Sequence, residues 1–476
     1  MTAPPFPIAP HPISAEVRLA YVLRHFRMAY EAVPQVSIGY EGLRPQVEVA
    51  DAAEGFFNEQ QPYPPAPTQR QWLGRTIPFF FDPEPQKPLL ELLPGSRAFI
   101  HADVLSAAFY LLSGWQEYFS EERDQHGRFP YSASVQHRYG FVTVPVVNYY
   151  FDVLKTAVEH VTGQQLQLRR WANGASWAAF ITHDIDNLYS AWKAPAKAAL
   201  RQGQLLSFGR QLWQHFTTPD AWDNLRQVQE TVASYGAKST FFFLPEHRRA
   251  ADGTPNADYA IHTLKSDIAA LETAGAEISL HGGIGAANNY SELMREIGLM
   301  AGQHHSWLRL STIVIRELTH MARQYGIKNG IRFHYLCWEP RLTSTMLDDL
   351  AFAYDSTLGF AEHYGFRNSY CLPFYPFNFA NGEPSTFLEI PLNVMDATLY
   401  HPRYLQLAPE EILPALTPMF QEIERFGGVC TVLWHNENFD PANENTGPRQ
   451  FAEIMEYLRS RRVAFVNGRE ICELVN

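Results

Sequence analysis

The sequence predicts an α/β fold in which the second part of the chain forms a parallel sheet or barrel. From Trp177 onward, short apolar runs alternate with amphipathic segments of helical periodicity, and this alternation is typical of consecutive β–α units. Several of the apolar runs end in titratable residues, and the ends of such strands are where α/β folds keep their active sites. The predicted strands read, in chain order, AAFIT, STFFFL, AEISLH, GIRFHY, AFAYDST, FLEIPL, GVCTVLWH and VAFVN.

The part of the chain before these strands has a different character, because it combines proline-rich loops with helical patterns. In the segment 103–119, apolar residues recur three and four positions apart, which predicts a packed helix. The turn signal Asn173-Gly174 then precedes the first strand. We therefore expect an N-terminal α/β accessory domain over residues 1–172 and a (β/α) barrel over residues 173–476.

Composition disfavours some partners and locations. The 476 residues carry a net charge of −12 and contain no concentrated run of Lys and Arg, so the sequence predicts no nucleic-acid partner. Prolines occupy the place where a secretory signal would have its apolar core, and no apolar run reaches membrane-spanning length. We expect a soluble, cytoplasmic protein without a membrane span. No feature of the sequence indicates an oligomeric state.

The first predicted barrel strand runs into Thr-His-Asp-Ile-Asp, which places carboxylates at Asp184 and Asp186. Side chains two residues apart in a strand point to the same side, so both carboxylates project together from the end of the strand. Two like charges this close resist joint ionisation unless a cation lies between them or one carboxyl stays protonated. The pair therefore predicts a metal site, a general base or both. The alternative is that one aspartate only caps the following helix.

Other predicted strands deliver titratable groups to the same rim, because the carboxyl ends of parallel strands meet at one edge. His281 follows an apolar strand and precedes a glycine-rich turn, and His435 ends another strand before a polar loop. A single histidine in such a place is more often structural, but the repetition favours a site. The further residues at or near strand ends are Arg332, His334 and Asp355.

Together these motifs resemble the NodB-type polysaccharide deacetylases over roughly residues 175–476. THDID resembles the first motif of that family, the Thr-Phe-Phe run in KSTFFFLP resembles its second strand, and LWH resembles its fifth motif. Two further stretches, IPLNVMDATL and GFRNSYCLPFYPFN, resemble a subgroup with an additional N-terminal domain. The resemblance implies an irregular (β/α) barrel of the NodB type preceded by an α/β accessory domain, which we expect to cover one side of the barrel mouth and to narrow substrate choice.

The resemblance also implies a role for each of these residues. In chain order, the implied roles are general base for Asp184, metal ligand for Asp186, metal ligand for His281, orientation of the base for Arg332, catalytic aspartate for Asp355 and general acid for His435.

One metal ligand that the family usually has is missing. The second motif commonly places a further histidine four residues after its first, and this chain has Gly285 there. His334 could replace that ligand, because it lies two residues after Arg332 and could point the same way, and a water could also fill the gap. His183 points to the opposite face. We expect a divalent metal, most simply zinc, although two or three ligands do not fix its identity.

The activity that the resemblance implies is hydrolytic removal of an N-acetyl group from an amino sugar. A metal would activate water, Asp184 would accept its proton, and His435 would protonate the departing amine. The expected substrate is an N-acetylated glycan or glycan precursor, either soluble or lipid-linked. Asp396 could tune His435, bind substrate or be structural. Five aromatic residues could stack on sugar rings or fill the core: Trp338, Tyr370, Phe374, Tyr375 and Trp434.

Two other functions stay open on the sequence alone. Barrels of this type also host hydrolysis of non-sugar C–N amide bonds, and a fold does not fix the substrate. The glycine at position 285 would also suit a catalytically silent carbohydrate-binding relative. The joint presence of Asp184, Asp186, Arg332 and His435 favours catalysis over silence.

Overall fold

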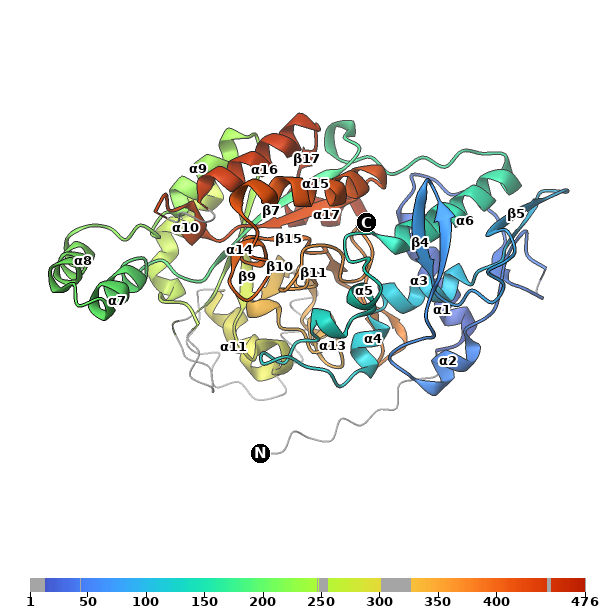
Figure 1. Ribbon diagram of the computed structural model, residues 1–476, viewed down its shortest axis with the longest axis horizontal. Coiled ribbons are helices and arrows are strands. Elements are labelled where there is room, and N and C mark those ends of the chain that lie inside the picture. Colours follow the sequence, from blue (N-terminus) through green and yellow to red (C-terminus); the bar gives the residue numbers. More distant parts are fainter. Residues whose placement is uncertain are drawn as a thin grey trace.

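The computed structural model describes residues 13–42, 44–245, 247, 256–300, 327–442 and 447–475. These residues form the mixed α/β fold that the sequence predicts, with an N-terminal group of strands and helices beside a larger sheet (Figure 1). The proline-rich start of the chain, residues 1–12, lies outside the described residues.

The N-terminal part contains two small sheets and several helices. The four-stranded sheet has the order β1-β2-β6-β5, in which β5 is antiparallel to β6 and the other pairs are parallel. β3 and β4 form a separate antiparallel hairpin. The strands are β1 (Ile38–Tyr40), β2 (Val47–Val49), β3 (Thr68–Trp72), β4 (Arg75–Phe79), β5 (Leu90–Leu93) and β6 (Arg97–Ile100). The helices are α1 (Ala15–Met28), α2 (Glu54–Glu59), α3 (Val104–Leu112), α4 (Trp115–Phe119), α5 (Val135–Arg138) and α6 (Val146–Thr162).

The segment 103–119 forms two helices where the sequence predicts one. Asp103 caps α3 by accepting a hydrogen bond from the backbone N–H of Ser106 at 2.9 Å, and every residue of α3 is buried. After Leu112 the chain turns at Gly114, which has a left-handed φ of 73°. Glycine adopts this conformation without steric cost, so α4 starts in a new direction.

The second part of the chain is built on a nine-stranded sheet. Its order is β14-β11-β10-β9-β8-β7-β16-β15, and β17 also pairs with β7. All of these pairings are parallel. The strands are β7 (Ala178–Ile185), β8 (Ser239–Phe243), β9 (Glu277–Gly282), β10 (Ile327–Phe333), β11 (Phe352–Asp355), β14 (Leu388–Glu389), β15 (Val394–Met395), β16 (Val429–Leu433) and β17 (Ala464–Phe465). Each of the eight predicted strand segments overlaps one of these strands, whereas β15 and the hairpin of β12 (Phe377–Asn378) and β13 (Glu383–Pro384) are not predicted.

The sheet curls until one short stretch of chain joins its two edges. Residues 388–395 contain both β14, which pairs with β11 at one edge, and β15, which pairs with β16 at the other. Alternate side chains enter different buried clusters, with Phe180 and Phe242 in one and Ile181 and Phe241 in the other. The sheet is therefore an irregular half-barrel that is buried on both faces.

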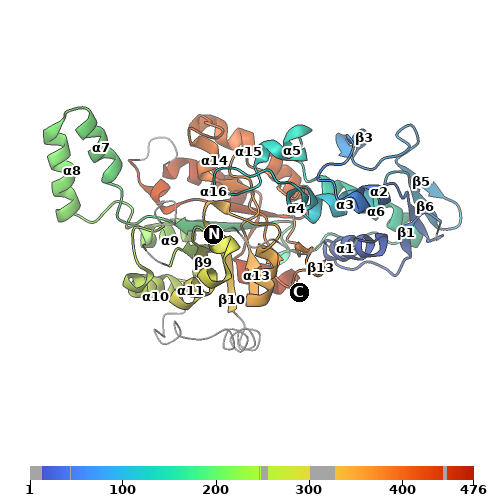
Figure 2. The ribbon, with the colours of Figure 1, turned by 90° about the horizontal axis from the view of Figure 1, so that it is seen from below.

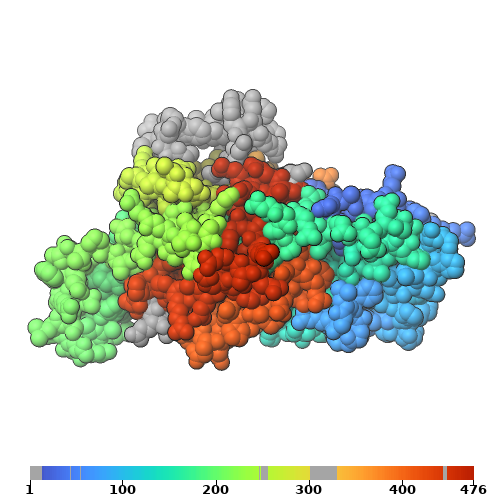
Figure 3. Space-filling view, turned by 90° about the horizontal axis from the view of Figure 1, so that it is seen from above, coloured from blue at the N-terminus to red at the C-terminus, as the bar shows by residue number. Residues whose placement is uncertain are grey.

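Helices pack against this sheet and surround it. α9 contacts β8, α10 and α11 contact β9, α15 contacts β16, and α17 contacts β10 and β11. The helices are α7 (Lys193–Arg201), α8 (Leu205–Thr217), α9 (Leu225–Ser234), α10 (Lys265–Thr273), α11 (Tyr290–Met300), α13 (Thr343–Leu350), α14 (Asp396–Tyr400), α15 (Pro409–Arg425), α16 (Pro448–Ser460) and α17 (Gly468–Val475). α7 and α8 stand apart as a hairpin at the end of the molecule opposite the N-terminal part (Figure 2), where they form the green lobe of the space-filling view (Figure 3). No helix in the described ranges is long and apolar enough to cross a bilayer.

The two parts of the chain share one hydrophobic core. A single cluster contains Tyr21 and Phe109 from the N-terminal part together with Phe377 and Trp434 from the second part. Tyr21 and Phe109 both meet the ring of Phe377 edge-on, at centroid distances of 5.3 and 5.0 Å. The strands before and after residue 172 belong to separate sheets, but both parts of the chain contribute to one hydrophobic cluster. The domain boundary at residue 172 stays a prediction.

A buried ion pair crosses the same junction. Arg367 donates hydrogen bonds from Nε and Nη2 to the two carboxylate oxygens of Glu117 at 2.8 and 2.6 Å. The two side chains are only 1% and 5% exposed. Such a two-pronged pair offsets the cost of burying both charges, but each charge is costly without the other.

Removing one member of this pair should destabilise the protein strongly. In Arg367→Ala the Glu117 carboxylate stays buried without its partner, and we expect the free energy of unfolding to fall by about 3–5 kcal/mol. Arg459→Ala is the control, because the Arg459–Glu456 pair is 53% exposed on both sides and should contribute less than about 1 kcal/mol. Urea denaturation followed by circular dichroism measures both changes, and equal effects would contradict a stabilising role for the buried pair.

Candidate active site

The ends of four strands of the large sheet bring the predicted site residues together. β7 carries Asp184 and ends just before Asp186, β9 carries His281, and β10 carries Arg332 and ends just before His334. In the pairing register of β9 and β10, Arg332 lies beside His281. His435 follows β16 on the other side of β7. The structure thus gathers all the predicted site residues at one rim except Asp355.

Asp186, His281 and His334 form a candidate metal centre. Nε2 of His281 lies 3.4 Å from Oδ1 of Asp186, and Nε2 of His334 lies 3.4 Å from Oδ2 of the same carboxylate. One candidate ligand atom from each residue lies within 4.8 Å of the others. Oδ1 of Asp186 is buried and has no hydrogen-bond partner among the described residues. Two imidazoles and one carboxylate around a common point are a donor set that suits a divalent transition metal such as zinc.

The backbone orients one of these imidazoles. Nδ1 of His281 donates a hydrogen bond to the carbonyl oxygen of Arg332 at 2.8 Å. This contact leaves Nε2 directed at the carboxylates, and such outer contacts commonly fix the tautomer of a histidine ligand. Gly285 has a φ of 89°, a conformation that L side chains rarely adopt. Position 285 offers no ligand atom, whereas Nε2 of His334 lies beside the Asp186 carboxylate.

The carboxylates and imidazoles at this centre shift each other's pKa. Burial raises the pKa of the Asp186 carboxyl, but His334 and His281 outweigh burial and hold that pKa well below its usual range. Burial lowers the pKa of His281, but Asp184 and Asp186 outweigh burial and raise it. The negative field that keeps a proton on His281 is also a field that attracts a divalent cation.

Arg332 holds Asp184 in a fixed orientation. Its buried guanidinium donates from Nη1 to Oδ1 of Asp184 at 2.9 Å and to Oγ1 of Thr182 at 2.8 Å. Nε and Nη2 donate to the backbone oxygen and the Oγ of Ser356 at 2.8 and 2.9 Å. The guanidinium also lies over the ring of Phe242, 4.4 Å from its centroid. Oδ2 of Asp184 is left facing the cluster, 3.6 Å from Nε2 of His281.

His435 is paired with Asp396. Nδ1 of His435 donates to Oδ1 of Asp396 at 2.7 Å, and the backbone N–H of His435 donates to Oδ2 at 2.7 Å. Nε2 of His435 lies 3.8 Å from Oδ2 of Asp186. Burial lowers the pKa of His435, but Asp396 outweighs burial and raises it well above its ordinary value. Of the alternatives for Asp396, contact with His435 is the one that the structure contains.

Asp355 lies on the other side of its strand. It pairs in register with Ile331, so its side chain shares the face of Ile331 and not that of Arg332. Both of its oxygens accept hydrogen bonds from Thr357, at 2.7 and 2.9 Å, and Oγ1 of Thr357 accepts one from the Phe333 N–H at 3.0 Å. These contacts support the end of β10, and a direct catalytic role for Asp355 remains a prediction.

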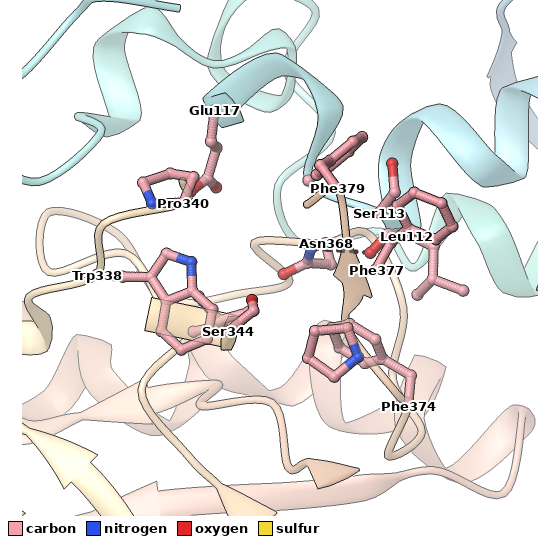
Figure 4. A pocket seen from close by; sticks show the side chains of 13 residues that line it. Leu112, Ser113, Glu117, Trp338, Pro340, Ser344, Asn368, Phe374, Phe377 and Phe379 are labelled. Carbon is pink, nitrogen blue, oxygen red and sulfur yellow. Dashed lines mark hydrogen bonds between the residues drawn. The ribbon is translucent and has the colours of Figure 1, made fainter. Parts of the chain in front are cut away.

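The five aromatic residues named as sugar-stacking candidates are at most 8% exposed. They are part of the buried core, and Trp434, for example, packs against Phe451 of α16. Trp338 and Phe374 line a cavity of about 20 Å³ between α3–α4 and the segment after β10, where Glu117 and Asn368 also point (Figure 4). A cavity of this size holds about one water and no sugar.

Two residues near the site have no role assigned from the sequence. Tyr335 is 38% exposed and its ring stacks on His334 at a centroid distance of 4.3 Å, so it is an aromatic group at the rim. Glu437 lies two residues after His435, and burial raises its pKa to about 7 although His435 opposes the shift. The polar loop His-Asn-Glu-Asn was the signal for Glu437, but nothing in the sequence distinguishes it from a solvated residue.

The N-terminal part reaches the turn that carries His334. Tyr335 and Leu336 both have a left-handed φ of 57°, which is uncommon for residues other than glycine. Nη1 of Arg128 donates to the carbonyl oxygen of Tyr335 at 2.7 Å, and the ring of His126 stacks on the Tyr335 ring at 4.8 Å and 7°. These contacts help to hold a strained turn in place beside the candidate metal centre.

One family model matches the N-terminal part of the chain. Residues 14–163 match the model of a family of unknown function, DUF7033, and this match ends before the first site residue. None of the curated proteins matches the sequence. A solved protein from Mycobacterium smegmatis, assigned as a polysaccharide deacetylase, is 15% identical with a TM-score of 0.40 and covers 64% of this chain and 92% of its own.

Two further solved structures give similar values. The allantoinase PuuE is 13% identical with a TM-score of 0.36, covering 64% of this chain and 91% of its own. A protein from Pseudomonas aeruginosa, also assigned as a polysaccharide deacetylase, is 12% identical with a TM-score of 0.39, covering 64% of this chain and 92% of its own.

Asp396→Asn should lower the pKa of His435. A raised pKa keeps the imidazole protonated to higher pH, and the Asp396 carboxylate is the largest cause opposing burial. Without that charge, His435 should lose its proton at lower pH. Titration of the metal-free protein by NMR with ¹⁵N-labelled histidine measures the change, and Asp440→Asn is the control for loss of a nearby acid. An unchanged titration in Asp396→Asn would refute this account of His435.

Proposed function

We propose that this protein is a metal-dependent hydrolase that removes an N-acetyl group from an amino sugar in a glycan or glycan precursor. The observation that carries the proposal is the arrangement of three groups at one rim. An aspartate held by arginine, Asp184, and a histidine held by aspartate, His435, both lie within 4 Å of members of the Asp186–His281–His334 cluster. A base, an acid and a set of metal ligands are the groups that metal-assisted amide hydrolysis uses.

A divalent metal held by Asp186, His281 and His334 would supply Lewis-acid chemistry, polarising a carbonyl and lowering the pKa of water from about 15.7 towards 7. The buried, unpartnered Oδ1 of Asp186 and the inward Nε2 of His281 support this assignment. Zinc suits this donor set of two histidines and one carboxylate. Iron is also bound by such a set, so elemental analysis should measure both metals.

The residues of the chain would divide the proton transfers between them. Asp184 would accept a proton from the attacking water at Oδ2, because Oδ1 is occupied by Arg332. His435 would donate a proton from Nε2 to the nitrogen of the departing amine, because its Nδ1 is occupied by Asp396. Arg332 would keep the Asp184 carboxylate oriented through its hydrogen bond to Oδ1. An amine is a poor leaving group without a proton, so the acid is as necessary as the base.

The sugar specificity of the proposal rests on the resemblance of the motifs to NodB-type deacetylases and not on a sugar-binding surface. Tyr335 is the exposed aromatic residue nearest to the cluster along the chain, but its ring already stacks on the rings of His334 and His126. A non-sugar amide would use the same base, acid and metal ligands, so release of acetate from N-acetylated amino-sugar oligomers is the assay that separates the two.

Substitutions of Asp184 and Asp186 should differ in their effect on metal content. Asp184→Asn should retain the metal and lose about 10²–10⁴-fold in rate of acetate release, because only the base is removed. Asp186→Asn and His334→Ala should lose most of the metal and the activity with it. His262→Ala, an exposed histidine outside the cluster, is the control.

Elemental analysis and acetate release, measured on the same preparations, decide the outcome. Full activity in Asp184→Asn would remove Asp184 as the base. Metal retained at wild-type levels in both Asp186→Asn and His334→Ala would remove the proposed centre. A metal-loaded wild-type protein that releases no acetate from any N-acetylated amino-sugar oligomer would contradict the proposed substrate class.

A further inference from the structure

The hairpin of α7 and α8 projects from the rim of the half-barrel. It is inserted between β7 and α9 and lies clear of the sheet at one end of the molecule (Figure 1, Figure 2). Its two helices pack on each other, with Ala196 and Ala199 buried and the ring of Trp192 stacked on His215 at a centroid distance of 4.4 Å. None of the residues of α8 is buried.

The apolar face of α8 is turned to solvent. The exposed fractions are 69% for Leu205, 93% for Leu206, 66% for Trp213 and 76% for Phe216. On a helical wheel these four side chains fall within an arc of about 100°, which is the width of an ordinary buried stripe. Leu200 on α7 adds a further exposed apolar side chain, at 53%. Among the described residues, more than half of the exposed large apolar side chains lie on this hairpin.

The charge of the hairpin is opposite to that of the protein. Residues 187–219 contain no aspartate or glutamate, in a chain of net charge −12. The basic residues of this stretch, all of them exposed, are Lys193, Lys197, Arg201 and Arg210. Two hairpins of this kind would repel each other, which disfavours a symmetric contact between the hairpins of two copies of the chain.

We propose that the α7–α8 hairpin is an interfacial anchor that binds the surface of a membrane containing anionic lipids. A projecting helix with Leu, Trp and Phe on one face and Lys and Arg beside them has the composition of helices that lie in the headgroup region. The apolar stripe enters the boundary of the acyl chains, and the basic side chains meet lipid phosphates. The convex, projecting form of the hairpin suits a flat surface. This inference does not depend on the proposed catalytic activity.

Hydrogen bonds connect both ends of the inserted segment, at residues 187 and 222, to the candidate active site. Nδ2 of Asn436 donates hydrogen bonds to the carbonyl oxygens of Asn187 and Trp222, each at 2.9 Å. Asn187 follows Asp186 and Asn436 follows His435 in the chain. Membrane binding through the hairpin would therefore hold the rim of the half-barrel close to the lipid surface. If the proposed function holds, this position favours a lipid-linked glycan precursor over a soluble one.

Vesicle flotation of the full-length protein tests the anchor. The probes are vesicles of phosphatidylcholine alone and of phosphatidylcholine mixed with phosphatidylglycerol. We expect flotation with the anionic vesicles, weakened by salt, and little with the neutral ones. The triple variant Leu206→Ser, Trp213→Ser, Phe216→Ser should bind at least about tenfold less. Leu73→Ser with Leu92→Ser is the matched control, because those leucines are 49% and 48% exposed in the N-terminal part and should leave binding unchanged.

Each alternative result overturns the proposal. Wild-type protein that does not float with anionic vesicles has no such anchor. Binding that the triple variant retains in full arises elsewhere on the surface. Sedimentation that shows a wild-type oligomer which the triple variant converts to monomers, without lipid binding in either, would make the hairpin a protein interface. Circular dichroism of both variants shows that the fold is kept, and acetate release plays no part in the test.

Discussion

The buried guanidinium of Arg332 is the group on which the rest of the site depends. From β10 it bonds to Asp184 on β7, to Ser356 after β11, and lies over Phe242 on β8. Its backbone oxygen holds His281 on β9. One residue thus connects five neighbouring strands at their carboxyl ends. A buried charge of this kind is costly unless its donors are used, and here Asp184, Ser356 and Phe242 together satisfy it. The charge that the fold must accommodate is the same charge that orients the candidate base.

The N-terminal part belongs to the same physical unit as the site. It shares the main hydrophobic core, pairs Glu117 with Arg367, and supports the strained turn after β10 through Arg128. Through these contacts the N-terminal part supports the turn that carries the third candidate ligand, His334. A role of the N-terminal part in narrowing substrate choice stays a prediction.

The sequence predicts the fold and the positions of the site residues because both follow from local pattern. Strand periodicity puts Asp184 and Asp186 on one side, and the same two-residue spacing puts His334 beside Arg332. For Asp355, local pattern predicts the position at the end of a strand but not the side to which the carboxylate points. That side depends on the pairing register of β11 with β10, which places Asp355 opposite Ile331 and not Arg332. The break at Gly114, the left-handed turn at Tyr335 and the exposed face of α8 depend on tertiary packing, which periodicity does not contain.

The central claim is that Asp186, His281 and His334 hold a divalent metal between Asp184 and His435. Anomalous diffraction from crystals of the zinc-loaded protein, recorded on both sides of the zinc absorption edge, tests this claim most directly. The account predicts one strong peak bounded by a carboxylate oxygen of Asp186 and the Nε2 atoms of the two histidines, at about 2.0–2.2 Å from each. A peak elsewhere, or none at these three residues, would contradict it.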